Sequence, residues 1–433
     1  MKTSAKDLIK FIDASPSCYH VINNIKEELL GNGFEELKES EGFKLERNKK
    51  YFTTRNGTSI IAFIIGDVKD DFSFNICASH SDSPTFKVKP SSKLANGNYS
   101  KLSVEGYGGM LCAPWFDRPL SVAGRVIVKN NNKLEIKLFN ADKDLLMIPN
   151  LPIHFNRTAN SGYAYNMATD MQPVLALGGE ATIEEIIAKE LGVEKENIIS
   201  HDIFLYNRQK GSIWGANKEF ISDSQLDDLE CAYTSLQGFL AGSNKDNINV
   251  YCCFDNEEVG SRTRQGADSS FLQDILKRIT LGLGYDEDQL LKALGSSFLV
   301  SADNAHAVHP NHPEIFDALN STFMNKGVVI KFNAAQSYTT DGLSSALFKE
   351  ICAKAKVPTQ TFTNRADLRG GGTLGNISSA HVSILSVDIG LAQLAMHSCY
   401  ETAGVDDIKY MAEALKEFYS TSIRIEPDSI TLD

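Results

Sequence analysis

The sequence predicts an α/β sandwich that is interrupted by an inserted β-rich block. Helical segments alternate with short apolar strands over residues 1–90 and again over residues 224–433. Residues 91–223 instead contain strand-like pieces separated by Gly and Asn breaks. Alternation of helices and strands is typical of α/β folds. We therefore expect one discontinuous α/β domain, 1–90 with 224–433, and a separate inserted domain, 91–223.

The first part of the α/β domain supplies helices and then strands. Apolar residues recur at helical spacing in AKDLIKFI and VINNIKEELL, both within residues 4–38. The short apolar runs SIIAFIIGD (59–67) and FSFNICASH (72–80) favour strands. After residue 224 we expect helices at 226–242, 270–284, 345–356 and 406–424. We expect strands between them at 247–254, 296–303, 328–333 and 380–390.

The inserted block has a different character. Its strand-like pieces are KLSVEGYGG, SVAGRVIVKNNNKLEIKLF and LPIHFNR, and its one helical piece is TIEEIIAKELG. The stretch KNNNK separates two alternating runs, as a hairpin turn does. The block is therefore predicted to be mainly β-structure.

Composition excludes several classes of partner. The net charge of −12 argues against nucleic acid, which requires clustered Lys and Arg. The N-terminus lacks the apolar stretch of a signal peptide, and the longest apolar runs are too short to span a bilayer. The eight cysteines form no CxxC pair and lie mostly in apolar segments. We expect a cytoplasmic protein with buried free thiols and no membrane partner.

Charged side chains stand at the ends of three predicted strands. His80 and Asp82 follow the first, Glu257 and Glu258 follow the second, and Asp303 ends the third. Ligands bind at the carboxyl ends of strands in open α/β sheets, so these groups are expected to share one edge. Successive side chains in an extended segment point opposite ways. One of the adjacent glutamates is therefore expected to bind a metal while its neighbour faces a water molecule.

Asp227 and His397 complete the candidate site. Asp227 opens a predicted helix, where the helix dipole alone favours a carboxylate. His397, taken alone, is more simply a core histidine. Combined with His80, Asp303 and one of the adjacent glutamates, however, they give two histidines and three carboxylates. That is the ligand set of a co-catalytic zinc pair.

Six motifs resemble those of the M18 family of metallo-aminopeptidases, the aspartyl aminopeptidase group. They occur in family order over nearly the whole chain: ASHSDSP (78–84), YGGMLCAPWFDRPLSVAGRV (107–126), ISDSQLDDL (221–229), FDNEEVGS (254–261), SADNAHAVHPNHP (301–313) and LAMHS (394–398). The resemblance implies a zinc-peptidase-type catalytic domain with an inserted dimerisation or lid domain. It also implies dimers that assemble into a dodecamer through the inserted domain.

The resemblance implies a role for each metal ligand. His80 and Asp303 would bind one zinc ion, and Glu258 and His397 would bind the other. Asp227 would bridge the two ions. Cobalt or manganese would also accept such a site.

Two further carboxylates are assigned by the same resemblance. Asp82 would orient the imidazole of His80. Glu257 would be the general base that takes a proton from a zinc-activated water. Asp228 occupies a position where the family often has Asn. The preceding residue, Asp227, agrees with the family pattern, so its bridging role is not put in doubt.

The implied substrates are peptides with a free N-terminus, with a preference for N-terminal Asp or Glu. Lys331 is the candidate cation for an acidic side chain of the substrate. The sequence pattern is equally consistent with a strand-end lysine that faces solvent. Tyr338 and His306 match substrate-contacting positions of the family. His154 would reach the active site of a neighbouring subunit, or else be satisfied locally within a strand.

Two other sequence patterns give weaker evidence for a functional site. His306, His309 and His312 are spaced by three, but the prolines of HPNHP predict a loop instead of one helical face. The stretch RGGGTLG (369–375) neither clearly follows a strand nor opens a helix, which argues against a dinucleotide site. We expect it to line the metal cleft, with Asp367 and Thr373 near substrate.

Two alternatives remain open at this point. A dinuclear zinc deacylase or carboxypeptidase could use the same scaffold, because a fold does not fix a substrate. A non-catalytic assembling shell would carry a degenerate site, and the intact ligand set argues against it. The contexts DNEEVGS and AHAVHP favour the aminopeptidase.

Overall fold

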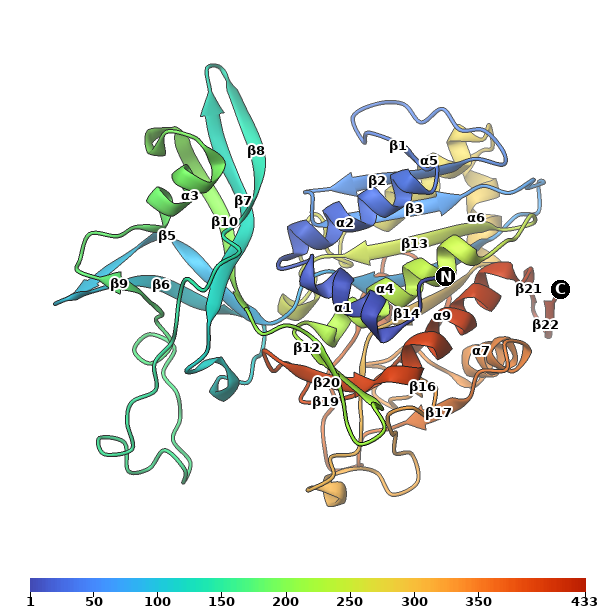
Figure 1. Cartoon of the computed structure of the whole chain (residues 1–433). Coiled ribbons are helices and arrows are strands. Elements are labelled where there is room, and N and C mark those ends of the chain that lie inside the picture. The colour runs from blue at the N-terminus through green and yellow to red at the C-terminus, as the bar shows by residue number, and fades with distance from the viewer.

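The chain forms an α/β part and a β-rich part, which lie on the right and on the left of Figure 1. The structure is a computed structural model that describes the backbone of residues 1–433 and every side chain except that of Asn96. Both chain ends lie on the α/β part (Figure 1).

The α/β part is built on one mixed sheet with the strand order β1-β2-β3-β13-β4-β14-β18-β16-β17. The bounds of these strands are β1 Glu35–Glu36, β2 Lys50–Arg55, β3 Ser59–Ile64, β13 Ile248–Phe254, β4 Phe74–His80, β14 Phe298–Ala302, β18 Leu385–Gly390, β16 Val328–Lys331 and β17 Thr359–Phe362. The central strands β13, β4 and β14 pair in parallel and are buried along their whole length. Strands buried on both faces require continuous apolar runs, as the sequence has here.

Helices cover both faces of this sheet. One buried apolar cluster includes α1 Ala5–Asp13, α2 Cys18–Gly31, α4 Leu226–Ala241, α7 Gly342–Lys354 and α9 Val405–Ser420, and a second includes α5 Phe271–Gly282, α6 Glu287–Gly295 and α8 Leu374–Ser378. Tyr251 and Cys253 of β13 belong to the first cluster and Cys252 to the second, so the clusters lie on opposite faces. This layering confirms the predicted α/β sandwich.

The β-rich part contains a sheet with the strand order β8-β7-β10-β5-β6-β9. Its elements are β5 Thr85–Asn96, β6 Tyr99–Tyr107, β7 Leu120–Asn130, β8 Lys133–Asn140, β9 Val174–Leu177, β10 Ile198–Asn207 and the helix α3 Ile183–Leu191. The predicted KNNNK turn joins β7 to β8. The first strand of this sheet begins at Thr85, six residues before the predicted start of the insert. The division into two domains stays a prediction.

A small sheet connects the two parts and has the strand order β11-β12-β20-β19-β15. It consists of β11 Ser212–Trp214, β12 Phe220–Asp223, β20 Glu401–Gly404, β19 Ala392–Leu394 and β15 Ala305–His306, and the C-terminus adds the hairpin β21 Ile423–Glu426 with β22 Ser429–Leu432. The small sheet therefore joins segments that lie far apart in the chain.

Two local predictions differ from the structure. Residues 151–157, predicted as strand-like, form turns, since Pro152 removes an amide donor from any ladder. RGGGTLG does open a helix, because α8 begins at Leu374, although that helix has only five residues. Among the described residues, no helix has the length and apolarity needed to cross a bilayer.

Gly238 allows α4 to pack closely on α9. A Cβ atom at this position would lie 2.7 Å from Cβ of Leu415 and 2.9 Å from the backbone nitrogen of Lys416. We expect Gly238→Ala to lower the free energy of unfolding by about 1–3 kcal/mol, because the overpacking outweighs the better helix propensity of Ala. Denaturant titration of the purified protein measures this change.

Gly31, at the end of α2, provides the matched control. A Cβ atom there meets nothing within 4 Å. Gly31→Ala is therefore expected to be neutral or slightly stabilising. Equal effects of the two substitutions would contradict the packing argument.

Candidate metal centre

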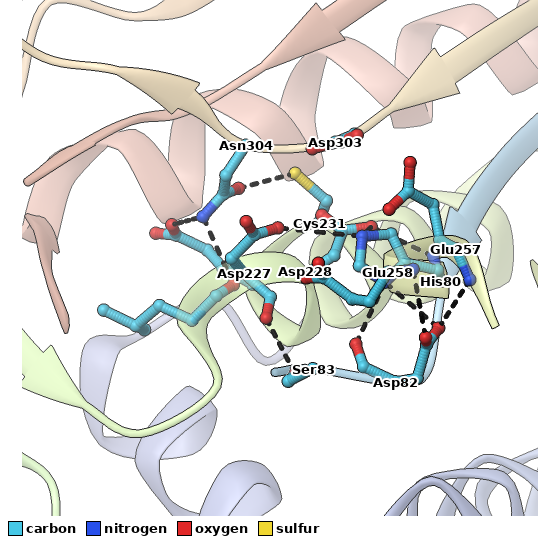
Figure 2. Close-up of polar contacts among 12 residues, drawn as sticks. His80, Asp82, Ser83, Asp227, Asp228, Cys231, Glu257, Glu258, Asp303 and Asn304 are labelled. Carbon is cyan, nitrogen blue, oxygen red and sulfur yellow. Dashed lines mark hydrogen bonds and ion pairs between the residues drawn. The ribbon is translucent and has the colours of Figure 1, made fainter. Parts of the chain in front are cut away.

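Three neighbouring strands deliver acidic and imidazole groups to one edge of the large sheet, as predicted. In the order β13-β4-β14, all three strands run in the same direction. His80 is the last residue of β4, Asp303 follows β14, and Glu257 and Glu258 follow β13 after a short turn. Figure 2 shows these side chains gathered with Asp227 and Asp228.

The two glutamates lie in a single 3₁₀ turn, Glu257–Val259, and not in an extended segment. The expected alternation of their side chains was therefore wrong. Asp82 explains the turn, because its carboxylate accepts the backbone N–H of Glu257 at 3.1 Å and that of Glu258 at 3.2 Å. The Tyr107 hydroxyl donates to the same carboxylate at 2.6 Å.

Asp82 also contacts the imidazole of His80. The backbone carbonyl of Asp82 lies 3.0 Å from Nδ1 of His80, and its carboxylate lies 3.5 Å from the same atom. Asp82 therefore links the histidine at the end of β4 to the glutamate turn after β13 (Figure 2).

Asp227 lies between the two histidines. Its Oδ1 atom is 3.7 Å from Nε2 of His80, and its Oδ2 atom is 3.4 Å from Nε2 of His397. Nε2 of His397 is also 3.5 Å from a carboxylate oxygen of Glu258. Asp227 and Asp228 have non-helical backbone angles although they lie within the bounds of α4, and the peptide bond between them is cis.

Within the described part of the chain, three groups of side chains bring ligand atoms within 4.8 Å of one another. They are His80, Asp227, Asp228 and Asp303; His80, Glu257 and Glu258; and Asp227, Glu258 and His397. Oxygen and imidazole nitrogen donors of this kind suit zinc. The Oδ1 atom of Asp227 is buried without a hydrogen-bond partner among the described residues, as a free ligand atom would be. The residues present therefore fit divalent cations.

The electrostatics agree with a site built for cations. Burial raises the pKa of Glu257 to about 8 and, together with Asp227, raises that of Glu258 well above its usual range. Burial also raises the pKa of Asp303. Burial opposes ionisation of Asp227 too, but His397 and His80 lower its pKa below the ordinary value. A bound cation offsets the cost of keeping such carboxylates ionised together.

A cavity of about 300 Å³ opens onto these groups, and Lys331, His306 and Tyr338 line it too. Lys331 is only 2% exposed, which excludes a solvent-facing lysine. Its Nζ atom donates to the backbone carbonyl of Asn304 at 2.9 Å and lies 3.6 Å from Asp303. The pKa of Lys331 is raised despite burial, chiefly by Asp303.

Other predicted residues divide between the cavity and the surface. Gly371, Gly372 and Thr373 of the glycine-rich stretch line the cavity. Asp367 is exposed and pairs with Arg365 outside it. His154 is exposed on the turns of 151–157 and does not line this cavity.

Glu401 is the main residue that the sequence did not single out. One of its carboxylate oxygens accepts the backbone N–H of Asp227 at 2.9 Å, and the other accepts that of His397 at 2.7 Å. The sequence signal that could have identified Glu401 is its place at the start of β20, only four residues after His397. Asp228 was also underrated, because its Oδ2 atom accepts the backbone N–H of His80 at 3.0 Å.

The amino-acid sequence is similar to a family of zinc peptidases. A family model described as aminopeptidase I zinc metalloprotease (M18) matches residues 11–419. A protein of Clostridium novyi strain NT, named probable M18 family aminopeptidase 2, is 47% identical over 426 residues. That match covers 96% of this chain and 98% of the relative.

Solved structures have the same fold. The cryo-EM structure of the Ape4 and Nbr1 complex matches with a TM-score of 0.92 and 35% identity, over 96% of this chain and 85% of that chain. The structure of the S. cerevisiae mApe1 dodecamer matches with a TM-score of 0.84 and 26% identity, over 96% of each chain. The predicted fold class is confirmed.

We expect Glu401→Gln to weaken metal binding by roughly tenfold or more. A glutamine offers one acceptor oxygen where two buried N–H groups need one each, so Asp227 or His397 loses its backbone anchor. Zinc affinity measured in competition with a chromogenic chelator reports this loss directly.

Glu413→Gln is the control, since Glu413 makes only a half-exposed ion pair with Lys416 on α9. It should bind zinc as the wild type does. Unchanged zinc affinity of Glu401→Gln would mean that the anchor is not needed.

Proposed function

The chain belongs to the M18 family of zinc metallo-aminopeptidases, and from this premise we propose a specific site and substrate. It removes N-terminal residues, preferably Asp or Glu, from peptides by means of two zinc ions and a glutamate base. The observation that carries the proposal is the place of Asp227 between His80 and His397, with Glu258 and Asp303 beside them.

These contacts support the proposed zinc ligands. His80 and Asp303 would hold one ion, Glu258 and His397 would hold the other, and Asp227 would be shared between them. When bound, the ions lower the pKa of a water molecule and polarise the scissile carbonyl. The chain itself contributes the fixed positions of its ligands, through Asp82 at His80 and Glu401 at His397.

Glu257 is the proposed general base. It lines the cavity and its backbone N–H is held by Asp82. Burial raises its pKa to about 8 in the absence of cations, and bound cations would favour the ionised form that can accept a proton. It takes the proton from the attacking water and passes a proton to the leaving amine.

Substrate selection is assigned to Lys331, Tyr338 and His306, which line the same cavity as the metal ligands. Lys331 supplies positive charge beneath Tyr338, whose ring centroid lies 5.3 Å from Nζ of the lysine. His306 lines the same cavity, where a ring N–H of its imidazole can donate a hydrogen bond. An acidic side chain of the substrate would find both a cation and a donor here.

We also propose a homo-oligomer for this chain. The S. cerevisiae mApe1 protein, which is 26% identical to this chain, is a dodecamer. The β-rich part is the proposed contact region, and His154 on its exposed turns would face a neighbouring subunit.

We expect Glu257→Gln to abolish hydrolysis of aminoacyl-nitroanilides while it leaves the zinc content unchanged, because an amide cannot take a proton from water. Turnover and metal analysis of the same preparation test this. N-acetylated substrates serve as a control, since only a deacylase would accept them. Persistent activity of the variant would mean that another group is the base.

We expect Lys331→Met to reduce kcat/KM for peptides that begin with Glu or Asp by about a hundredfold, because the acidic side chain of the substrate loses its buried cationic partner. The value for peptides that begin with Leu should fall far less. A panel of dipeptides measures this difference. If kcat/KM falls equally for both classes of peptide, Lys331 acts by positioning Asp303 and does not contact the substrate side chain.

A further inference from the structure

The strand β8 forms one edge of the six-strand order β8-β7-β10-β5-β6-β9. It pairs with β7 along its full length, from Lys133 opposite Asn130 to Asn140 opposite Ala123. In Figure 1 the β7/β8 hairpin projects away from the rest of the β-rich part. The outer side of an edge strand presents backbone groups to which another strand can pair.

The same strand exposes an apolar row. Leu134 is 65% exposed, Ile136 is 69% exposed and Leu138 is 38% exposed. These three alternate residues share one face of the strand. Ile127 lies directly opposite Ile136 on β7, so the apolar row continues onto the neighbouring strand.

The backbone of these residues points outward. A two-residue turn joins Asn130 to Lys133, which makes them the closing hydrogen-bonded pair of the hairpin. Hydrogen-bonded and non-hydrogen-bonded pairs alternate from there, so Leu134, Ile136 and Leu138 direct their N–H and C=O groups away from β7. A partner strand would bond to these residues.

The charges of β8 select one register. Glu135 and Lys137 share the other face of the strand and lie 3.9 Å apart at their closest charged atoms. If two copies pair antiparallel about a twofold axis at Ile136, each Glu135 faces Lys137 of the other copy. The same register sets Leu134 opposite Leu138 and aligns the full strand. A twofold axis at Leu134 or Leu138 leaves about half of the strand unpaired.

We propose that β8 pairs with β8 of a second copy of this chain, antiparallel and centred on Ile136, so that the two sheets become continuous. The inference specifies one contact of the homo-oligomer proposed above and depends on that assembly. Opposite-charge and apolar cross-strand pairs both favour this register, whereas like charges in it repel. A twofold contact of this kind is self-complementary and closed.

Charge variants of the full-length protein test the register by analytical ultracentrifugation. Glu135→Lys, or Lys137→Glu alone, brings like charges together twice and should weaken association by roughly tenfold or more. The double variant, Glu135→Lys with Lys137→Glu, should restore it. Lys133→Glu is the control and should leave association unchanged, because Lys133 faces Phe139 in this register.

Crosslinking with a short bismaleimide locates the axis. In a hydrogen-bonded pair the Cα atoms are about 5.5 Å apart. Ile136→Cys subunits should therefore crosslink to one another, beyond the background of the native cysteines. Leu134→Cys alone should not, because its own copy lies roughly 13 Å away along the strand, but a mixture with Leu138→Cys subunits should.

Several outcomes would overturn the proposal. Wild-type association of Glu135→Lys, or a folded double variant that stays dissociated, would exclude this pairing while leaving the assembly intact. A protein that is monomeric at every concentration would remove the assembly itself. Peptide hydrolysis plays no part in these measurements, so their failure is distinct from a failure of the enzymatic proposal.

Discussion

The crowding of carboxylates at the end of the central strands is the constraint on which the site depends. Asp227, Asp228, Glu257, Glu258 and Asp303 converge around His80 in a region where burial opposes ionisation. Such a concentration of buried acid is unfavourable unless positive charge accompanies it. Lys331 supplies part of that charge, and divalent cations, held by the two neutral imidazoles and the carboxylates, would supply the rest.

The surrounding hydrogen bonds hold the acids in place against their repulsion. Asp82 anchors the glutamate turn, and Asp228 accepts the amide of His80. Glu401 spans from Asp227 to His397, which belong to segments some 170 residues apart in the chain. These carboxylates accept hydrogen bonds from backbone amides, so they fix the backbone position of each ligand residue and leave its metal-facing atoms free. The arrangement is a preorganised shell of the kind that metal sites require.

Much of this centre could be predicted because strand ends are local signals. The apolar runs before His80, Glu257 and Asp303 predict buried strands. Neighbouring parallel strands end at the same edge of the sheet. The 3₁₀ turn at Glu257 could not be predicted, since it depends on the carboxylate of Asp82, 175 residues earlier. Burial of Lys331 and the bridging contacts of Glu401 likewise arise from tertiary packing. The sequence pattern identifies residues that start or end helices and strands. It does not predict which distant backbone amide their side chains will bind.

The small sheet has a consequence for how the protein can vary. Its ladder ties β12, just before Asp227, to β20 with Glu401, then to β19 before His397, and finally to β15 with His306. These segments are thus fastened to one another by the small sheet itself, and the β-rich part adds the contacts of Tyr107 with Asp82 and of Gly109 with His397. Evolution can remodel the outer strands of the β-rich part, and with them access and quaternary geometry, while these contacts keep the mutual spacing of the reacting groups. Modularity of this sort separates the chemistry of a peptidase from the architecture that encloses it.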